Sequence, residues 1–463
     1  MFFSAKVGLI VGGAIAGIFA SGVAHSQTLS DALAAAYMNN PELLAARAAL
    51  RSEDEAVPQA LANWRPNVSL SSGIDRTHTH LNTRTANRDQ MRSPRDASVS
   101  VSQSLFRGLR TIAGVNKAEL DVKSARATLL AKEQDVLLSA TTAYMAVVRD
   151  QAVLDLNIKN EQVLQRQLEA TQDRFRVGEI TRTDVSQAEA RVAGAAADRI
   201  QSEGNLNNSR ANYLNVIGEV PGKLLAPTTL GTLPAGLDAA TKAAMADHPD
   251  VVGLSYDEKA ARENIKSVRG ELLPTLSLAG SFARAWESST NDSQLTTGKV
   301  GVDLTVPLYQ KGSVYSRLRA AKQNAGESLL KLEDARRDAR ETAAKSWETL
   351  ETAKARIKSF TAQIKAAEIA LEGVQREAAV GSRTVLDVLD AEQELLDAKV
   401  NLVSANRDQV VASFQLQEAV GRLTAKNLGL QVKIYDPTTH YKEIRSKWFG
   451  SNSSGQDPVG VKN

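Results

Sequence analysis

The sequence predicts a mixed α+β protein that contains two copies of one unit. Two segments, VGEITRTDVSQAE (177–189) and VGSRTVLDVLDAE (380–392), match at seven of thirteen positions, and such a repeat indicates a duplicated structure. Several short stretches alternate apolar and polar residues, which is typical of strands. Two stretches of more than sixty residues contain no proline and are rich in Ala, Leu, Glu, Lys and Arg, which favour long helices.

Composition narrows the possible functions. The 463 residues carry a net charge of +3, and 24% of them are charged. This balance gives no strong field for nucleic acid, so no nucleic-acid partner is expected. The chain has no cysteine, which excludes disulfides, thiolate metal sites, cysteine nucleophiles and a lipid anchor on an N-terminal cysteine.

Residues 1–26 have the pattern of a secretory signal peptide. Lys6 precedes an apolar run from Val7 to Ala20, and Ala24 and Ser26 stand at −3 and −1 of a cleavage site. The alternative is an uncleaved membrane anchor, but the run is short for the ~20 residues that a spanning helix needs. We therefore expect a mature chain that begins near Gln27 and functions outside the cytoplasm.

The rest of the chain divides into two repeats, residues 27–217 and 237–423, joined by a Pro/Gly-rich linker at 218–236 and followed by residues 424–463. In each repeat the order is helix, strand, loop, strand, long helix, turn, helix. A proline opens and another closes the first helical pattern of each repeat (Pro41 and Pro66; Pro249 and Pro274), as expected from the places that proline tolerates.

The predicted strands alternate with a period of two, so that one face is apolar and the other polar. Either a sandwich sheet or an outer-membrane barrel strand fits this pattern. The segment 75–96 between the first two strands is long and polar, like the extracellular loops of barrels. The apolar positions are Val68, Leu70 and Ile74; Val99, Val101 and Leu105; Val300, Val302, Leu304, Val306 and Leu308.

The predicted helices have matching lengths in the two repeats. At 1.5 Å per residue, a helix from Gly108 to Phe175 spans roughly 100 Å, while Thr181–Ile217 and Pro41–Trp64 together span about 91 Å. The second repeat gives a long helix, Ser313–Glu377, beside Thr384–Arg422 and Pro249–Leu272. Apolar residues seven apart predict coiled-coil packing (Leu389, Leu396, Val403 and Val410; Val388, Leu395 and Leu402).

Four strands cannot close a barrel, and an open sheet edge cannot exist in lipid. A cyclic oligomer solves this problem. At this point the chain resembles the outer membrane factor, or TolC-like, family of trimeric efflux and secretion proteins. The residues that carry the resemblance are the second turn, VGSRTVLDVLDAE, with NPEL, HPD, RPNVSLS and LPTLSLAG. It covers about Thr28 to Thr424.

The resemblance implies a trimeric 12-stranded transmembrane β-barrel, four strands per protomer, continued by a long periplasmic α-helical coiled-coil barrel. The location is then the Gram-negative outer membrane, with a periplasmic tunnel. Residues 424–463 would join a collar at the midpoint and end in a tail. The two matching turns would be the two helix–turn–helix tips of one protomer.

The function implied by the resemblance is that of a passive exit duct in a tripartite efflux pump or a type I secretion system. Its partners would be a periplasmic adaptor, an inner-membrane RND or ABC transporter, two further copies of the chain and outer-membrane lipid. Drugs, toxic compounds or secreted proteins would be its cargo. The alternatives are a periplasmic coiled-coil adaptor and an envelope enzyme. The strand–loop–strand duplication argues against the first, and missing catalytic motifs argue against the second.

The tip charges are the candidate gate. In the family, the residue matching Arg383 links to the neighbouring protomer's matching Thr/Asp pair, and inner acids line the constriction. This chain has Thr183 and Asp184 in the first tip, and Arg383, Asp387 and Asp390 in the second. It departs from the family at Ala378, where the best-known member has a tyrosine. The plainer alternative is ordinary solvated helix charge, with acids complementing the helix dipole.

Two glycines and two valines are the candidate contacts for the adaptor. Gly178 and Gly381 are expected to supply turns with positive φ, and Val177 and Val380 beside them to be exposed apolar residues, which often mark contact sites. In the family these tips meet adaptor hairpins.

No catalytic residue, cofactor or metal ligand is predicted. The chain has no GxSxG or HExxH motif. His78 and His80 would point the same way on a strand, but we interpret them as part of a solvated loop.

Overall fold

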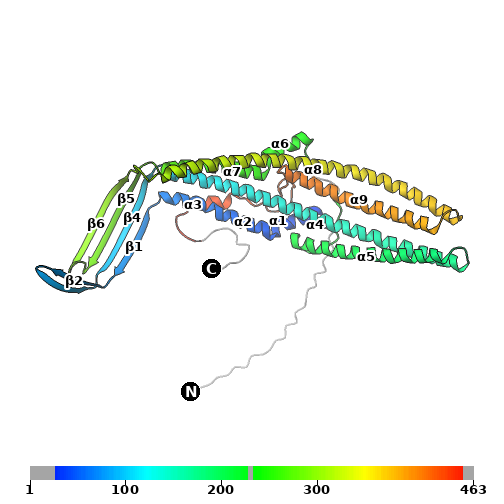
Figure 1. The fold of residues 1–463 in the computed structure, drawn as a ribbon, viewed down its shortest axis with the longest axis horizontal. Coiled ribbons are helices and arrows are strands. Elements are labelled where there is room, and N and C mark those ends of the chain that lie inside the picture. Colours follow the sequence, from blue (N-terminus) through cyan, green and yellow to red (C-terminus); the bar gives the residue numbers. More distant parts are fainter. Residues whose placement is uncertain (1–26, 228–232, 452–463) are drawn as a thin grey trace, which may run out of the picture.

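The computed structural model describes residues 27–227 and 233–451. The predicted signal peptide, part of the linker and the end of the C-terminal tail lie outside these ranges. The protomer is elongated, with strands at one end and two helical hairpin tips at the other (Figure 1). No helix within the described ranges is long and apolar enough to cross a membrane.

Two helices of 67 residues each, α4 (Arg110–Arg176) and α8 (Ser313–Ala379), run the length of the helical part. Toward the tips they pack against α5 (Arg182–Ile217) and α9 (Val385–Ala419). Toward the sheet, α4 packs against α2 (Pro41–Asp54), and α7 (Pro249–Gly270) packs against both α4 and α8. The predicted arrangement of one long helix beside two stacked shorter ones is therefore present in both halves (Figure 1).

One predicted helix is divided. The segment Pro41–Trp64 was expected to be continuous, but α2 ends at Asp54, and α3 (Ala56–Leu61) and a 3₁₀ turn, η1 (Ala62–Trp64), follow. The cause is Pro58, which has no N–H to donate to the carbonyl four residues earlier, at Asp54, and whose ring crowds that position.

Three short helices were not predicted. α1 (Leu29–Asn39) and α6 (Leu237–Asp247) precede the proline-led helices of the first and second halves, and α10 (Thr439–Ile444) lies in the C-terminal segment. Thr28 begins α1 with a capping box, in which it exchanges hydrogen bonds with Asp31. The sequence signal for this helix is Thr28 followed three residues later by an acid.

The main sheet is antiparallel and has the order β1–β4–β5–β6. Its strands are β1 (Asn67–Ile74), β4 (Arg95–Arg107), β5 (Thr275–Trp286) and β6 (Gln294–Thr305). The two halves of the chain thus join through the β4–β5 pairing. The segment 75–96, expected to be a loop, contains a hairpin of β2 (Thr77–Thr83) and β3 (Ala86–Arg92).

The register places apolar residues opposite apolar ones and serines opposite serines. Leu70 pairs with Val99, and Val99 with Phe282. On the other face, the Ser69 and Ser100 hydroxyls lie 2.7 Å apart. The predicted alternation fails at two places. A bulge between Ser104 and Phe106 removes Leu105 from the register, and β6 ends at Thr305, before Pro307, which cannot donate to a ladder.

The largest core lies at the midpoint of the helices and contains three tyrosines, Tyr37, Tyr144 and Tyr213. The Tyr144 hydroxyl lies 2.6 Å from the Leu225 carbonyl oxygen and accepts a hydrogen bond from the Leu225 N–H. Residues after the second repeat also join this core, among them Ala425 and Leu430. The linker and the C-terminal segment therefore pack around one collar.

Candidate functional site at the helical tips

The two tips are built from the same backbone motif. At the end of α4, Gly178 has φ = +83°, and the Glu179 N–H donates to the Arg174 carbonyl. At the end of α8, Gly381 has φ = +79°, and the Ser382 N–H donates to the Glu377 carbonyl. Both are Schellman motifs, in which glycine provides the left-handed residue. Glycine is needed for the backbone alone, because a Cβ at either glycine would meet no atom within 4 Å.

Each return helix then begins with a capping box. The Thr181 N–H donates to Asp184 Oδ2 at 2.9 Å, and the Asp184 N–H donates to Thr181 Oγ1 at 3.3 Å. Thr384 and Asp387 repeat this exchange at 2.9 and 3.2 Å. Hydrogen bonds from Thr181 lower the pKa of Asp184, and those from Thr384 lower the pKa of Asp387. Both carboxylates are therefore held ionised at the tip.

Arg383 has partners within its own protomer. Its Nε donates to Glu377 Oε2 at 3.0 Å, and its Nη1 lies 3.9 Å from Asp387 Oδ1. The hydrogen bond that Arg383 donates to Glu377 and the negative charges of Glu377 and Asp387 raise the pKa of the guanidinium. Since this side chain is half exposed, the guanidinium remains accessible to a neighbouring surface.

An ion pair that the sequence analysis did not predict joins the two hairpins. Arg191 Nη2 on α5 contacts Asp390 Oδ1 on α9, although the two residues are 199 positions apart. Beside this pair, α4, α5 and α9 share a small apolar core. It consists of Leu164, Leu168, Ala188, Ala195, Val385 and Leu389. Asp390, which the sequence analysis predicts at the constriction, thus also links the two tips through its ion pair with Arg191.

The predicted heptad positions of α9 form two buried stripes. Leu389 belongs to the core shared with α4 and α5, whereas Val388 and Leu395 pack against α8 in a second core with Ala378. Leu396 and Val410 are buried, and Leu402 and Val403 are half-buried. Ala378, the position at which the sequence departs from the best-known family member, is therefore a small buried residue at the end of α8.

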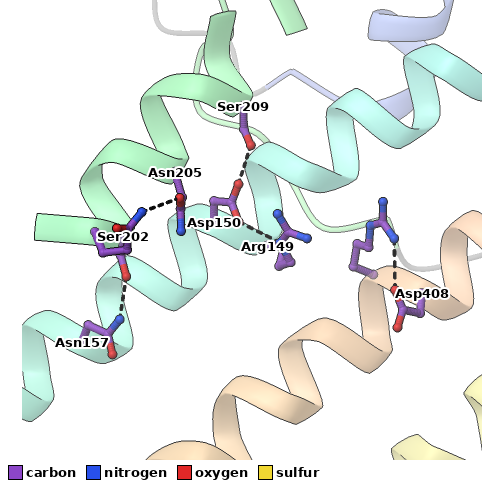
Figure 2. A network of polar contacts seen from close by, with 9 residues as sticks. Arg149, Asp150, Asn157, Ser202, Asn205, Ser209 and Asp408 are labelled. Carbon is purple, nitrogen blue, oxygen red and sulfur yellow. Dashed lines mark hydrogen bonds and ion pairs between the residues drawn. The ribbon is translucent and has the colours of Figure 1, made fainter. Parts of the chain in front are cut away.

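Away from the tips, polar side chains interrupt the seam between α4 and α5. Asn157 Nδ2 donates to Ser202 Oγ at 2.6 Å, and Asp150 lies between Ser209 and Arg149 (Figure 2). The Asn157–Ser202 and Asp150–Ser209 contacts join the two helices, which also pack through larger side chains such as Tyr144 and Tyr213. Buried polar pairs of this kind fix the register of helices more than they add stability.

The other predicted tip residues are exposed. Val177 and Val380 expose 72% and 79% of their surface, which makes an apolar residue the most prominent feature of each turn. Thr183 is exposed in the first turn of α5. The protomer brings Arg383 and Asp387 together but does not bring Arg383 to Thr183 or Asp184, which belong to the other tip.

Comparison with known proteins decides the family. The model of the family described as "Outer membrane efflux protein" matches residues 32–219 and 240–422, which together make up most of the chain. The chain belongs to the outer membrane efflux protein family. Its two matched segments correspond to the two halves seen in the structure, and the predicted TolC-like resemblance is confirmed.

Individual relatives of the efflux family cover nearly the whole chain. The outer membrane efflux protein BepC of Brucella suis is 36% identical over 428 residues, which are 92% of each chain. The outer membrane protein TolC of Vibrio cholerae is 27% identical over 432 residues, or 89% of this chain and 96% of the relative. The CmeC outer membrane channel of Campylobacter jejuni has the same fold, with a TM-score of 0.77, 16% identity and coverage of 90% and 89%.

Membership in this family establishes the fold and the general function. The chain is an outer-membrane export channel with a mixed α+β fold, and its family is one of channel proteins that act in efflux and secretion systems. Among the described residues, no group of three or more His, Asp or Glu side chains is placed to hold a metal ion. His78 instead pairs with Asp89 across the β2–β3 hairpin.

Proposed function

We propose that three copies of this chain form the exit duct, with their sheets closed into one 12-stranded barrel in the outer membrane. The observation that carries this proposal is the sheet itself. It has two edges, β1 and β6, and one face rich in Val, Leu and Phe. Edges of this kind need partners in lipid, and identical neighbours provide them through cyclic symmetry.

The barrel is tested by two adjacent substitutions on β6. Leu304 pairs with Leu276 on the apolar face, and Asp303 pairs with Ser277 on the polar face. Leu304→Arg should lower assembly in the outer membrane, because a basic residue on the lipid-facing surface is unfavourable, by up to ~2–4 kcal/mol at the midplane and by less toward the interface, where Leu304 lies one residue before the end of β6. Asp303→Arg, which adds the same side chain one residue away, should assemble far better. Equal amounts of the two variants in outer-membrane fractions would reject the proposed faces.

The exposed tips are the proposed docking site for a periplasmic adaptor. Val177 and Val380 lie beside the positive-φ residues Gly178 and Gly381 and are open to solvent. Bulky residues at both glycines should abolish export without changing the oligomer or its location. Gly312→Leu is the matched control, because Gly312 also has a positive φ (+75°) and open space around it but lies at the opposite end of α8.

The charged side chains behind these turns are the proposed gate. Arg383 would bind the Thr183–Asp184 segment of a neighbouring protomer, while Asp387 and Asp390 would line the opening. Threefold symmetry would place three copies of Arg383 and six aspartates around the opening. A narrow acidic opening concentrates cations. Within each protomer, the Arg191–Asp390 pair adds a further restraint, because it holds the α5 and α9 hairpins together.

The proposed partners are a periplasmic adaptor and an inner-membrane transporter of the RND or ABC type. Residues 1–26 are the proposed signal peptide, which directs export of the chain from the cytoplasm. Since BepC is an outer membrane efflux protein, the similarity favours efflux over protein secretion as the task of this chain. A deletion strain tested against a drug panel and for secreted proteins separates the two. Drug sensitivity that wild-type protein reverses, with normal secretion, supports efflux, and the opposite result supports secretion.

A further inference from the structure

The C-terminal segment does not stop at the midpoint collar but continues along the helices toward the sheet. Its helix α10 packs against α2. His440 Nδ1 lies 3.1 Å from Asp54 Oδ2, and both side chains are buried. The neighbouring Tyr441 packs on a small apolar core around Val57 and Val122. This part of the tail is therefore fixed to the wall of the protomer.

Two further contacts lead the segment to the end of the sheet that faces the helices. Arg445 Nη2 lies 2.9 Å from Glu119 Oε1 on α4. The carbonyl of Lys447 then accepts a hydrogen bond of 2.7 Å from Arg65 Nη1. Since Arg65 lies two residues before β1 begins, the residues after Lys447 are held at the rim of the sheet.

At this rim the tail presents two aromatic side chains. Trp448 exposes 57% and Phe449 86% of its surface. The Arg65 guanidinium lies 4.8 Å from the centre of the Trp448 ring, within the range of a cation–π contact. At the same end of the sheet, Trp64 precedes β1 and Tyr309 follows β6, and both are exposed. The Trp448 and Phe449 ring centres lie 6.5 Å apart, so the two rings form one exposed aromatic pair beside the Arg65 guanidinium.

We propose that Trp448, Phe449 and Arg65 form an interfacial anchor, which inserts into the phospholipid headgroup zone of the periplasmic leaflet of the outer membrane. This inference rests on the proposed barrel. Trp and Tyr are enriched at this depth because their rings are amphipathic, and exposed Trp64 and Tyr309 continue such a belt along the rim. A guanidinium has five N–H donors, so Arg65 can bind a phosphate while it bonds the Lys447 carbonyl.

A neighbouring protomer is the competing occupant of this surface. The combination of an apolar ring, a second ring and a cation favours lipid, because the headgroup zone alone offers apolar chains and phosphates at one level. Arg65 lies two residues before β1, where Val68 and its partner Val101 belong to the apolar face, so the anchor continues the surface that the proposed barrel places in lipid.

The chain contains four tryptophans, which allows a direct test of depth. In full-length protein reconstituted into phospholipid vesicles, three of them are replaced by Phe so that Trp448 alone remains. Vesicles carry bromine on the acyl chains, either near the headgroup or near the bilayer centre. We expect a blue-shifted emission for Trp448 and a larger loss of intensity with the shallow label than with the deep one.

Two other single-tryptophan proteins serve as controls. Trp347 on α8, which packs against a separate core shared by α6, α8 and α9, should be quenched by neither label. Trp286, at the far end of β5, should be quenched if the sheet is in the bilayer. Quenching of Trp286 without quenching of Trp448 would overturn the anchor and leave the barrel intact. This holds even if Trp448 emission is blue-shifted, because a neighbouring subunit that covers Trp448 would give that result. Absence of quenching at both positions would overturn the barrel and the anchor together.

Discussion

The α4–α5 and α8–α9 hairpins end in turns of the same design, but their return helices are packed differently. Within one protomer, α5 buries a narrow line of mostly small or polar side chains near its tip, including Ala188, Ala195 and Ser202. α9 buries Leu and Val on two sides, toward α8 and toward the α4–α5 hairpin. The same repeat thus gives one return helix, α5, that packs along a single face near its tip, and another, α9, that packs along two faces.

This difference suggests separate tasks for the two hairpins. The helix with the wider apolar face, α9, also has Arg383 and Asp387 at its tip and Asp390 just behind them. The α5 seam contains the Asn157–Ser202 and Asp150–Ser209 contacts, which fix its alignment with less apolar contact. We expect substitutions in α9 to affect stability more than equivalent ones in α5.

The largest expected effect is at the point where the two hairpins meet. Leu389 is 2% exposed, in the core shared by α4, α5 and α9. Leu389→Ala should destabilise the tip by about 2–4 kcal/mol, because it leaves a cavity between three helices. Hydrogen exchange along the first turns of α5 and α9 measures this effect. Leu386→Ala is the control, since Leu386 is exposed one turn away. Similar exchange in both variants would show that the hairpins are not packed together there.

The second expected effect is on the pH dependence of stability, and it differs between equivalent positions near the C-terminal ends of α5 and α9. Three residues before the glycines that end these helices, Gly218 and Gly421, stand Asn215 and Glu418. Burial, with Asp135 and Asp250 nearby, raises the pKa of Glu418 to about 7. The folded state therefore holds a proton that the unfolded state releases above its ordinary pKa of 4.5, and stability falls as the pH rises from 4.5 to 7.

The loss at Glu418 amounts to roughly 3 kcal/mol at most, from the size of the pKa shift. In Glu418→Gln, the melting temperature of the assembled protein should fall less between pH 5 and pH 8 than in the wild type. Asn215→Asp places a carboxyl at the corresponding position of α5, near Asp135 in the same pocket, and should steepen the pH dependence. An unchanged slope in Glu418→Gln would show that this carboxyl is ionised throughout.

A smaller and equal effect is expected at the two capping boxes. Thr181→Ala and Thr384→Ala each remove the side chain that accepts a hydrogen bond from the N–H of the third residue of the return helix, at a cost of ~1 kcal/mol. Because the boxes have the same geometry, faster hydrogen exchange should be confined to the first turn of α5 or of α9 and be similar in size. A much larger effect at one tip would mean that its threonine has a second role.

The smallest effect on stability is expected at the ion pair that links the hairpins. Arg191 and Asp390 are both partly exposed, so Arg191→Gln should cost only ~0–1 kcal/mol. Arg191→Gln should change the width of the opening more than it changes stability, because the ion pair fixes the position of one tip relative to the other. A cross-link between cysteines introduced at the two turns should form more slowly in Arg191→Gln than in the parent double-cysteine protein. Equal rates would assign no positional role to the pair.

The sequence predicted the features that depend on local patterns. Prolines, glycines and alternation located the long helices, the turns and the apolar face of the sheet, and Thr384 with Asp387 formed an acid-bearing first turn as expected. Pro58 was overlooked, and with it the break after α2. The hairpin β2–β3 was missed because its strands are polar on both faces and resemble a solvated loop.

Contacts between distant segments were beyond the reach of the sequence. The pairs Arg191–Asp390 and His440–Asp54 depend on the register in which separate helices pack, and no local pattern specifies that register. The heptads of α9 indicated that it packs along its length, but they did not tell which stripe faces α8 and which faces the other hairpin.

The central claim is that the charged tips close a duct, and the conductance of the reconstituted channel in planar bilayers tests it most directly. Arg383→Ser should raise single-channel conductance, with a difference from wild type that shrinks at high salt as exposed pairs are screened. Asp387→Ala combined with Asp390→Ala should lower cation selectivity and abolish block by multivalent cations. Wild-type conductance in the first variant, together with wild-type selectivity in the second, would show that these residues are solvated helix charges and not a gate.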